Sequence, residues 1–337
     1  MKTGIDPDTT AFIERLPKTE THLHIEAAVP YRLVAGLHSG SAPRESDPSE
    51  FWHESFRFDT FEQFEAVLFG VALEWYTSAE RYHEAARAIF EDLRAENVRY
   101  LETSFHIGII EMFGIPGEEI IQAIKEAAPE GFEVRVFMGM LRDNYHGEMR
   151  KVIDDMPNWQ QLDGVDIHGT EEKPLEEWNA RAWAEARQAG KTTKAHAGEF
   201  TSADSVREVL DFLDVDRVEH GIRAADDPAL VERLVRERIP LDTCPISNYK
   251  LRAVESMERH PIRPLFDAGV LCTISRDDPV VFGNTVCREY AVLADSLGFS
   301  RSELAAVART GFEIALLPEE DKRRHIEEID ALAGDLG

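Results

Sequence analysis

Short apolar runs rich in β-branched residues alternate with longer amphipathic segments from one end of the chain to the other. The short runs have the length and composition of buried strands, and the longer segments carry apolar residues at helical spacing. Eight such runs occur: ETHLHIE from Glu20, VRYLETSF from Val98, FEVRVFMGM from Phe132, LDGVDIHG from Leu162, TTKAHAGE from Thr192, RVEHGI from Arg217, IPLDTCP from Ile239 and VLCTISRDD from Val270. Strands alternating with helices predict a parallel sheet, and eight of them predict an α/β fold, a (β/α)8 TIM barrel with extra helices.

The segments between these runs predict helices that surround the barrel. Residues 79–97 form one long amphipathic pattern, and residues 202–214 form another, with Ser202 in position to cap it. Two further helices, over 285–298 and 301–317, and a charged tail around 321–330 follow the last strand. The aromatic segment 30–97 is long for a single connection, and an insertion there would lie over the barrel mouth as a lid. We expect residues 1–337 to form a single barrel domain.

The charge balance favours a small-molecule ligand. The 337 residues include 64 acidic and 37 basic side chains, a formal net charge of -27 at pH 7. Such a surface repels nucleic acid and anionic membranes, so neither is an expected partner. There is no apolar run typical of a signal peptide or a membrane span, and Cys244, Cys272 and Cys287 form no CxxC pair. We expect a cytoplasmic protein, and the sequence leaves its oligomeric state open.

Side chains that bind metals gather at the ends of four predicted strands. His22 and His24 are two residues apart, so on an extended strand both side chains point to the same face. His196 ends the fifth run, His220 the sixth and Asp277 the eighth. The carboxyl ends of barrel strands form the face on which active sites are built. Three imidazoles and one carboxylate suit Zn2+ with a position left for water, so one zinc ion per chain is the predicted cofactor.

Two carboxyl groups lie beside this metal set. Glu199 follows His196 by three residues, and Asp278 directly follows Asp277. A metal ion activates water, but the departure of a ring amino group also needs an acid that protonates the ring, and Glu199 is the candidate. His220 could take a proton from the attacking water or stabilise the charge that develops on it. Asp278 could accept a proton from the attacked amine or orient the ring.

Six motifs, in order along nearly the whole chain, carry a resemblance to a known family: PKTETHLHIEAAVP, VDIHGTE, HAGE, EHG, CPISNYKL and SRDDPVVFG. In these motifs the sequence resembles the adenosine/adenine deaminase family of the metal-dependent amidohydrolase superfamily. The resemblance implies zinc ligands at His22, His24, His196 and Asp277. It implies that Glu199 donates a proton to N1 of a purine and that His220 is the catalytic histidine. Purine contacts are implied for Asp278, the backbone of Gly169 and Glu26.

The first motif departs from the pattern of adenosine deaminases. Ala27 stands where many members have Gly. Glu26 stands where adenosine deaminases usually carry Asp and where members acting on free adenine tend to carry Glu; it would face the ribose or the space where a ribose would lie. In the second strand, the segment YLETSFH lacks an Arg that some adenosine deaminases show and offers Ser104, Phe105 and His106 instead. Arg276 stands before the paired aspartates, where a small residue is usual. The sequence gives no account of Arg276, and none of these changes touches the predicted metal ligands.

The main functional prediction is zinc-dependent hydrolytic deamination of an adenine-type purine, with adenosine converted to inosine and ammonia. Adenine and aminodeoxyfutalosine are alternative substrates, because the catalytic residues contact only the purine. A further alternative is another amidohydrolase acting on an amide or ester. Such enzymes often bridge two metals with a carboxylated Lys, for which this chain offers only Lys194. A binding protein that has lost activity is disfavoured because every predicted ligand and Glu199 are present.

Three features also have a purely structural interpretation. Asp278 precedes Pro279 and could merely cap a turn or helix. The Phe-rich stretch 51–64 is more often core than a lid that contacts substrate. His106 and His168 end strands and could line the barrel mouth.

Overall fold

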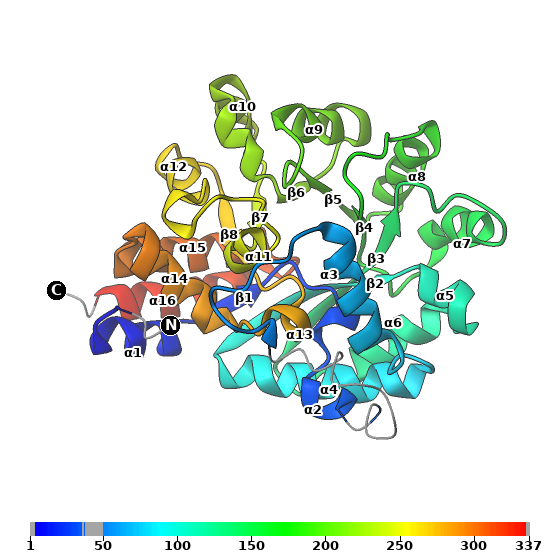
Figure 1. The fold of residues 1–337 in the computed structure, drawn as a ribbon, viewed down its shortest axis with the longest axis horizontal. Coiled ribbons are helices and arrows are strands. Elements are labelled where there is room, and N and C mark those ends of the chain that lie inside the picture. Colours follow the sequence, from blue (N-terminus) through cyan, green and yellow to red (C-terminus); the bar gives the residue numbers. More distant parts are fainter. Residues whose placement is uncertain (1–3, 36, 38–49, 335–337) are drawn as a thin grey trace.

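The computed structural model describes residues 4–35, 37 and 50–334, and its central element is a sheet of eight parallel strands (Figure 1). Neighbouring strands follow the order of the chain from first to last. The strands are β1 (Lys18–Glu20), β2 (Val98–His106), β3 (Glu133–Leu141), β4 (Gly164–His168), β5 (Thr192–Ala197), β6 (Arg217–His220), β7 (Leu241–Thr243) and β8 (Cys272–Ile274). Every strand overlaps its predicted run, and the predicted TIM barrel is confirmed.

The barrel closes through the segments that follow β1 and β8. A parallel bridge joins Leu23 to Asp277, and another joins His24 to Ser104 on β2. The backbone N–H of His24 donates to the carbonyl of Asp277 (3.2 Å), and the N–H of Asp277 donates to the carbonyl of His22 (3.3 Å). The first predicted run overlaps β1 only at Glu20. The rest of that run is bridged backbone that brings His22 and His24 to the barrel mouth.

Helices lie around the strands and connect them (Figure 1). The Ser78 side chain accepts a hydrogen bond from the Arg81 N–H at the start of α4 (Ala79–Ala95), and Ser202 accepts from the Asp204 N–H before α9 (Ala203–Glu208). Both starts follow the sequence prediction. The other connecting helices are α5 (Gly108–Phe113), α6 (Gly117–Glu126), α7 (Met149–Asp155), η5 (Met156–Asn158), α8 (Glu177–Gln188), η6 (Val209–Leu213), η7 (Ile222–Asp226), α10 (Pro228–Glu237), α11 (Pro245–Lys250), η8 (Met257–Arg259) and α12 (Ile262–Asp267).

The chain after β8 folds back onto the barrel, where it lies beside the first helix, α1 (Pro7–Arg15) (Figure 1). Helix α15 packs on both β1 and β8. Gly311 permits this approach, because a Cβ atom at that position would lie 2.0 Å from Oγ1 of Thr19 on β1. The predicted charged tail is a helix that packs on α15. The helices of this region are α13 (Pro279–Phe282), α14 (Val286–Leu297), α15 (Arg301–Ile314) and α16 (Glu319–Gly334).

The connection between β1 and β2 covers the barrel mouth, and α3 lies in front of the strands in Figure 1. Residues 36 and 38–49 of this connection lie outside the described part of the chain. The Phe64 ring stacks on the ring of Phe282 in α13, with centroids 5.4 Å apart, so part of the Phe-rich stretch is core. Phe61 is only partly buried and faces the barrel mouth. The elements before α4 are η1 (Glu26–Ala28), α2 (Tyr31–Val34), α3 (Phe61–Leu68) and the π-helical turn η4 (Phe69–Leu73).

Charged residues fill the barrel interior beneath the mouth, where branched apolar residues are usual. Nζ of Lys194 lies 2.7 Å from a Glu102 oxygen and 3.4 Å from oxygens of both Glu219 and Asp242. Arg217 lies 2.6 Å from Glu102 and 3.7 Å from Asp242. All five side chains are buried. Charges removed from water must be paired, so this network holds four strands together only while both cations and all three carboxylates are present.

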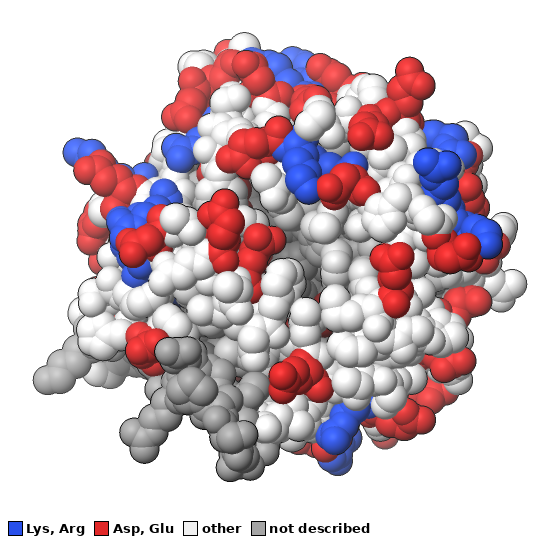
Figure 2. Space-filling view, turned by 45° about the vertical axis from the view of Figure 1, so that its right-hand side comes forward, with Lys and Arg blue, Asp and Glu red and all other residues white. Residues whose placement is uncertain are grey.

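The molecular surface carries the excess of acidic residues that the sequence indicates. Figure 2 shows carboxylates spread over one face of the molecule, with fewer basic side chains among them and a hollow near the centre. None of the helices in the described ranges combines the length and the apolar character needed to cross a bilayer. Cys244, Cys272 and Cys287 are free thiols.

Candidate active site

The predicted site residues come together at the carboxyl ends of the strands. His196 lies on β5 and Glu199 comes two residues after the end of that strand, while His220 is the last residue of β6. Asp277 and Asp278 follow β8. The backbones of His220 (φ 63°) and Asp277 (φ 65°) are left-handed, a conformation that costs a non-glycine residue free energy. The fold holds both residues in this conformation, which aims their side chains at the mouth.

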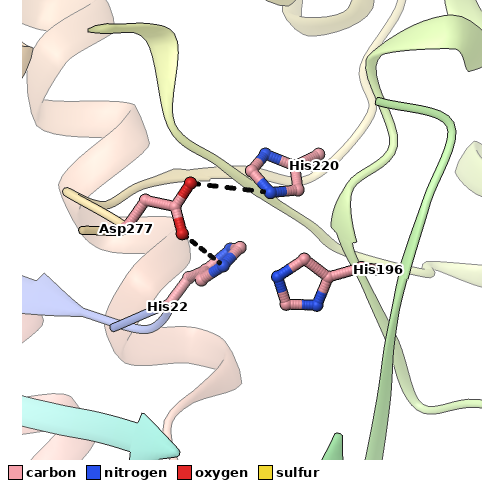
Figure 3. Close-up of side chains that lie close together, drawn as sticks. All are labelled: His22, His196, His220 and Asp277. Atoms are coloured by element: carbon pink, nitrogen blue, oxygen red, sulfur yellow. Dashed lines mark ion pairs between the residues drawn. The ribbon is translucent and has the colours of Figure 1, made fainter. Parts of the chain in front are cut away.

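Ring nitrogens of four histidines and the Asp277 carboxylate share one small space. Nε2 of His22 and Nε2 of His24 each lie 3.3 Å from Oδ1 of Asp277, and Nε2 of His24 lies 3.3 Å from Nε2 of His196. Nε2 of His220 lies 3.8 Å from Oδ2 of Asp277. Figure 3 shows His22, His196, His220 and Asp277 pointing toward this space, and they offer ligand atoms that lie within 4.8 Å of one another.

The outward-facing nitrogens of these rings are held by other groups of the protein. Nδ1 of His22 lies 3.3 Å from the Asp242 carbonyl oxygen, and Nδ1 of His24 lies 3.0 Å from the Ser104 hydroxyl. Nδ1 of His196 lies between two carboxylates, 2.8 Å from Glu219 and 3.2 Å from Asp166. Such outer contacts fix the ring orientation and raise the basicity of the inner nitrogen, as at metal sites. The Ser247 hydroxyl likewise donates to Oδ2 of Asp277 (2.7 Å), which leaves Oδ1 toward His22 and His24.

This donor set fits a metal ion. The buried Nε2 of His22 has no hydrogen-bond partner in the described structure. Nε2 of His24 faces Nε2 of His196, so two imidazole nitrogens meet where a shared cation would satisfy both. Both His24 and His220 lie within reach of the set formed by His22, His196 and Asp277.

Glu199 is a buried carboxyl group at the edge of the histidine cluster. Its Oε1 accepts a hydrogen bond from the Asn248 amide (2.7 Å), and its Oε2 lies 3.4 Å from Nε2 of His220. Burial, and next the charge of Asp277, raise the pKa of Glu199 to about 8. Both causes disfavour the ionised form, so the site holds a carboxylic acid at neutral pH.

Asp278 faces the cavity instead of capping the helix that follows. It occupies the N-cap position of α13, but its side chain makes no capping hydrogen bond. The side chain is buried and lines the mouth cavity. Burial and the adjacent Asp277 raise the pKa of Asp278 well above its ordinary value. The purely structural interpretation of this residue as a cap is therefore wrong.

The site opens into a cavity between the strand ends and the helices of the β1–β2 connection. The side of the cavity formed by the strand ends is polar, and Gly169 lies on the cavity wall in a left-handed conformation (φ 82°). The opposite side is formed by α3 and η4, which contribute one carboxylate, Glu65, and six apolar residues: Phe61, Phe64, Leu68, Phe69, Ala72 and Leu73. The predicted lid therefore lines the cavity.

Glu26 forms a second polar group on the cavity wall. Its Oε1 accepts a hydrogen bond from the Tyr82 hydroxyl (2.5 Å), and the backbone N–H of His106 donates to the same carboxylate (3.2 Å). Nδ1 of His106 lies 3.0 Å from Nε2 of His168, and both rings line the cavity. Burial raises the pKa of Glu26 to about 7 and lowers the pKa of His106 to about 4. His106 and His168 are thus mouth residues.

Lys194 is not placed to become a carboxylated metal bridge. Its Nζ donates to the Thr21 carbonyl and pairs with Glu102, Glu219 and Asp242 below the site. A carboxylated Lys is an anion, and at this position it would meet three carboxylates. Electrostatic repulsion therefore disfavours the alternative of two bridged metals.

Arg276 neutralises a buried carboxylate behind the histidine cluster. Its Nε donates to Oε2 of Glu20 (2.6 Å), and its backbone N–H donates to Oε1 of the same residue (2.7 Å). Asn284 donates to the Arg276 carbonyl (3.0 Å). Glu20 and Arg276 therefore connect β1 to the loop that carries Asp277, which supplies the account that sequence alone lacks.

Several residues that contact the site were not predicted. Asp166 lies two residues before His168, and Glu219 lies directly before His220. A charged side chain within an otherwise apolar strand is unusual, and this signal could have revealed both residues. Ser247 and Asn248 lie in the motif CPISNYKL without any spacing that indicates their contacts. Tyr82, which reaches Glu26 from α4, carries no signal beyond the helical apolar pattern.

Comparisons with known proteins identify a family and solved structures to which this chain is similar. A family model described as adenosine deaminase matches residues 17–332. A protein of Sphingopyxis alaskensis named adenine deaminase is 32% identical, with 97% of each chain covered, and a namesake from Chlorobium luteolum is 30% identical, with 94% of this chain and 95% of the relative covered. The crystal structure of an adenine deaminase from Arthrobacter aurescens superposes with a TM-score of 0.85 at 26% identity, covering 95% of this chain and 99% of that one. A zinc-bound amidohydrolase from Burkholderia ambifaria also gives a TM-score of 0.85, at 27% identity over 99% of this chain and 97% of its own.

Proposed function

This chain belongs to the adenosine deaminase family, and from that premise we propose that it removes the 6-amino group of free adenine by hydrolysis. It is a metal-dependent aminohydrolase, and its relatives support a purine as the substrate. The sequence alone favoured adenosine, with adenine as an alternative. The adenine deaminase relatives favour that alternative, so adenine replaces adenosine as the first expected substrate.

The predicted ligands His22, His24, His196 and Asp277 are proposed to hold one zinc ion. Their converging nitrogens and Oδ1, each fixed from behind, support this assignment. Bound zinc supplies a water nucleophile at neutral pH by lowering the pKa of that water. The zinc-bound state of the Burkholderia relative agrees with zinc as the metal.

Glu199 is proposed as the acid that protonates N1 of the purine ring. Protonation draws electrons from C6 and makes the ring susceptible to attack by water, after which ammonia can depart. Burial keeps this carboxyl group in its acid form, and the Asn248 amide holds its Oε1. The acid proton is therefore available on Oε2, the oxygen nearer to His220.

Three wall residues are proposed to orient the purine. Asp278, whose pKa is raised by burial, is a hydrogen-bond donor for N7 in its acid form. The backbone of Gly169, which also lines the cavity, binds another edge of the ring. Glu26 offers a carboxylate oxygen to the N9–H that free adenine carries and adenosine lacks.

The observation that carries the choice of the free base is the apolar face formed by α3 and η4. Ribose hydroxyls buried against this face would lose hydrogen bonds with water and find only Glu65 as a polar partner on these helices. A flat purine, by contrast, gains from contact with Phe61 and Phe64. The cavity is thus better suited to adenine than to its nucleoside.

The substrate is tested by assaying zinc-loaded protein for ammonia release and for the change in ultraviolet absorbance. Adenine, adenosine, AMP and aminodeoxyfutalosine are offered separately. We expect kcat/KM for adenine to exceed that for the other three by 100-fold or more, because unpaired buried hydroxyls cost about 1–3 kcal/mol each. A higher kcat/KM for adenosine would overturn the choice of substrate, and no ammonia from any of the four would overturn purine deamination.

The catalytic acid is tested with Glu199→Gln, which keeps the shape of the side chain but removes its acid proton. Activity should fall by at least about 100-fold while zinc content and circular dichroism stay unchanged. Glu232→Gln is the matched control, because Glu232 is an exposed carboxylate on α10. An active Glu199→Gln enzyme would rule out the proposed role. Metal analysis should give one zinc per chain, whereas two would favour the bridged alternative.

A further inference from the structure

A chain of buried hydrogen bonds runs from α12 to the catalytic residues. The backbone N–H of Ile262 donates to Nδ1 of His260 (3.1 Å), and Nε2 of His260 lies 3.1 Å from Oδ1 of Asn248. Nδ2 of Asn248 lies 2.7 Å from Oε1 of Glu199 and 3.1 Å from Nδ1 of His220. His260 and Asn248 are buried. This hydrogen-bond chain reaches both Glu199 and His220, and of its contacts only the one between Asn248 and Glu199 enters the reaction as proposed above.

The first bond in the chain fixes the proton on His260. A backbone N–H can only donate, so Nδ1 of His260 must supply a lone pair to Ile262. Burial lowers the pKa of His260 to about 3, and the ring is therefore neutral, with a single N–H. That N–H is on Nε2. His260 consequently donates to Asn248, and the atom it meets must be the amide oxygen.

The orientation of the Asn248 amide follows from His260. With Oδ1 toward His260, the NH2 group faces Glu199 and His220, and its two N–H bonds match two acceptors. The opposite orientation would place the NH2 group against the N–H of His260, donor against donor. Nδ1 of His220 is thus an acceptor without a hydrogen, so the ring N–H of His220 lies on Nε2. Amide and ring assignments of this kind are decided by the network, and here every bond agrees.

We propose that His260 and Asn248 are positioning residues that hold His220 as its Nε2–H tautomer and keep the acid proton of Glu199 on Oε2. His220 then presents an N–H donor where its Nε2 faces Glu199 (3.4 Å) and Asp277 (3.8 Å). A protonated Nε2 cannot coordinate a metal or accept a proton. His220 therefore stabilises negative charge on the attacking oxygen, and His24 completes the metal ligands. The tautomer rests on the contacts alone, whereas its part in catalysis rests on the proposed function.

The tautomer is measured in metal-free protein labelled with 15N-histidine. Two-bond 15N–1H correlation spectra distinguish the nitrogen that carries hydrogen from the one with a lone pair. A His220→Gln variant identifies the signals of this ring by their loss. We expect Nε2 of His220 to carry the proton near neutral pH. A proton on Nδ1 of His220 would overturn the proposal, whatever reaction the enzyme catalyses.

Variants test the positioning role by changing or restoring one hydrogen bond at a time. Asn248→Asp replaces the amide donor with an oxygen, so the His220 proton should move to Nδ1; an unchanged tautomer would contradict the network. His260→Leu removes the first side chain of the hydrogen-bond chain, and kcat for adenine should fall about 10- to 100-fold with little change in KM. His260→Gln should restore most of that loss, because its amide can donate to Asn248 and accept from Ile262.

His325→Leu controls for the loss of a partly buried imidazole, since His325 lies on α16 and packs on Phe312. Unchanged kcat and an unchanged His220 spectrum in folded His260→Leu would refute the role of His260. If the parent enzyme does not deaminate adenine, the proposed function fails, and the spectra of the parent and of Asn248→Asp still decide the tautomer. The two failures are therefore distinguishable.

Discussion

Removing Arg276 should destabilise the protein far more than removing a surface arginine that makes a similar ion pair. Arg276 and Glu20 are 8% and 0% exposed and lie 2.6 Å apart. Arg32 and Asp92 are 54% and 46% exposed and lie 2.8 Å apart. Arg276→Met would remove the guanidinium from the buried Glu20 carboxylate and leave it the hydrogen bond from the backbone N–H of residue 276. Breaking a buried pair costs about 3–5 kcal/mol, whereas an exposed pair contributes about 0–1 kcal/mol.

Urea unfolding of metal-free protein measures this difference without interference from metal binding. The free energy of unfolding falls by about 3 kcal/mol per molar urea for a protein of this size. Arg276→Met should therefore lower the unfolding midpoint by about 1 M or more, and Arg32→Met by less than about 0.3 M. Adding Glu20→Gln to Arg276→Met should recover part of the loss, because a neutral amide needs no counter-charge. Equal midpoint shifts for the two arginine variants would refute the reasoning.

The pH dependence of Arg276→Met supplies an independent check. Burial raises the pKa of Glu20, and Arg276 is the main influence that lowers it. Without Arg276 that pKa rises further. A group with a raised folded pKa contributes stability at low pH that is lost as pH rises through that pKa. The variant should therefore lie closer in stability to the parent at pH 5 than at pH 8, and the opposite trend would exclude an uncompensated Glu20 as the cause.

Three further predictions follow from other parts of the structure. Burial raises the pKa of Glu289 to about 8, so the stability that its acid form contributes should be lost as pH rises through about 8; urea midpoints should show this loss in the parent and a smaller one in Glu289→Gln. Phe61→Ala should raise KM for adenine about tenfold with little change in kcat, since about 1.4 kcal/mol of apolar contact is lost, and a change confined to kcat would contradict a binding role. His24→Asn should weaken zinc binding, measured by competition with a chelator, by more than His220→Asn does; the reverse order would assign the metal to His220.

The fold could be predicted because each strand carries its own signal. Alternating runs of β-branched residues and helical patterns are local properties, and caps such as Ser202 mark where helices begin. The first strand is the exception. β1 ends at Glu20, and the run that suggested a longer strand is held by bridges to Ser104 and Asp277, residues distant in the sequence. Such pairing depends on barrel closure, which no local pattern contains.

The side chains of the candidate site that could bind metal were predictable from residue type and position at a strand end. The residues that act through a contact with another segment were not predictable. Histidines and carboxylates at strand ends indicate a metal, and the structure brings all of the predicted ligands together. The contacts of Asn248 and Arg276 depend on distances between separate loops, and nothing in their own segments indicates them. The metal-ligand and catalytic roles, and the single domain over residues 1–337, stay predictions.

The parallel bridge between Leu23 and Asp277 lies where the two ends of the barrel meet, so the histidine cluster is built from the first and the last part of the barrel sequence. His22 is synthesised early and Asp277 late, with more than two hundred and fifty residues between them. A nascent chain therefore cannot assemble the complete cluster until the segment with Asp277, about four-fifths of the way along the chain, has left the ribosome. Bound metal would then link the segments that follow β1 and β8, and the complete site could bind metal only after the barrel has closed.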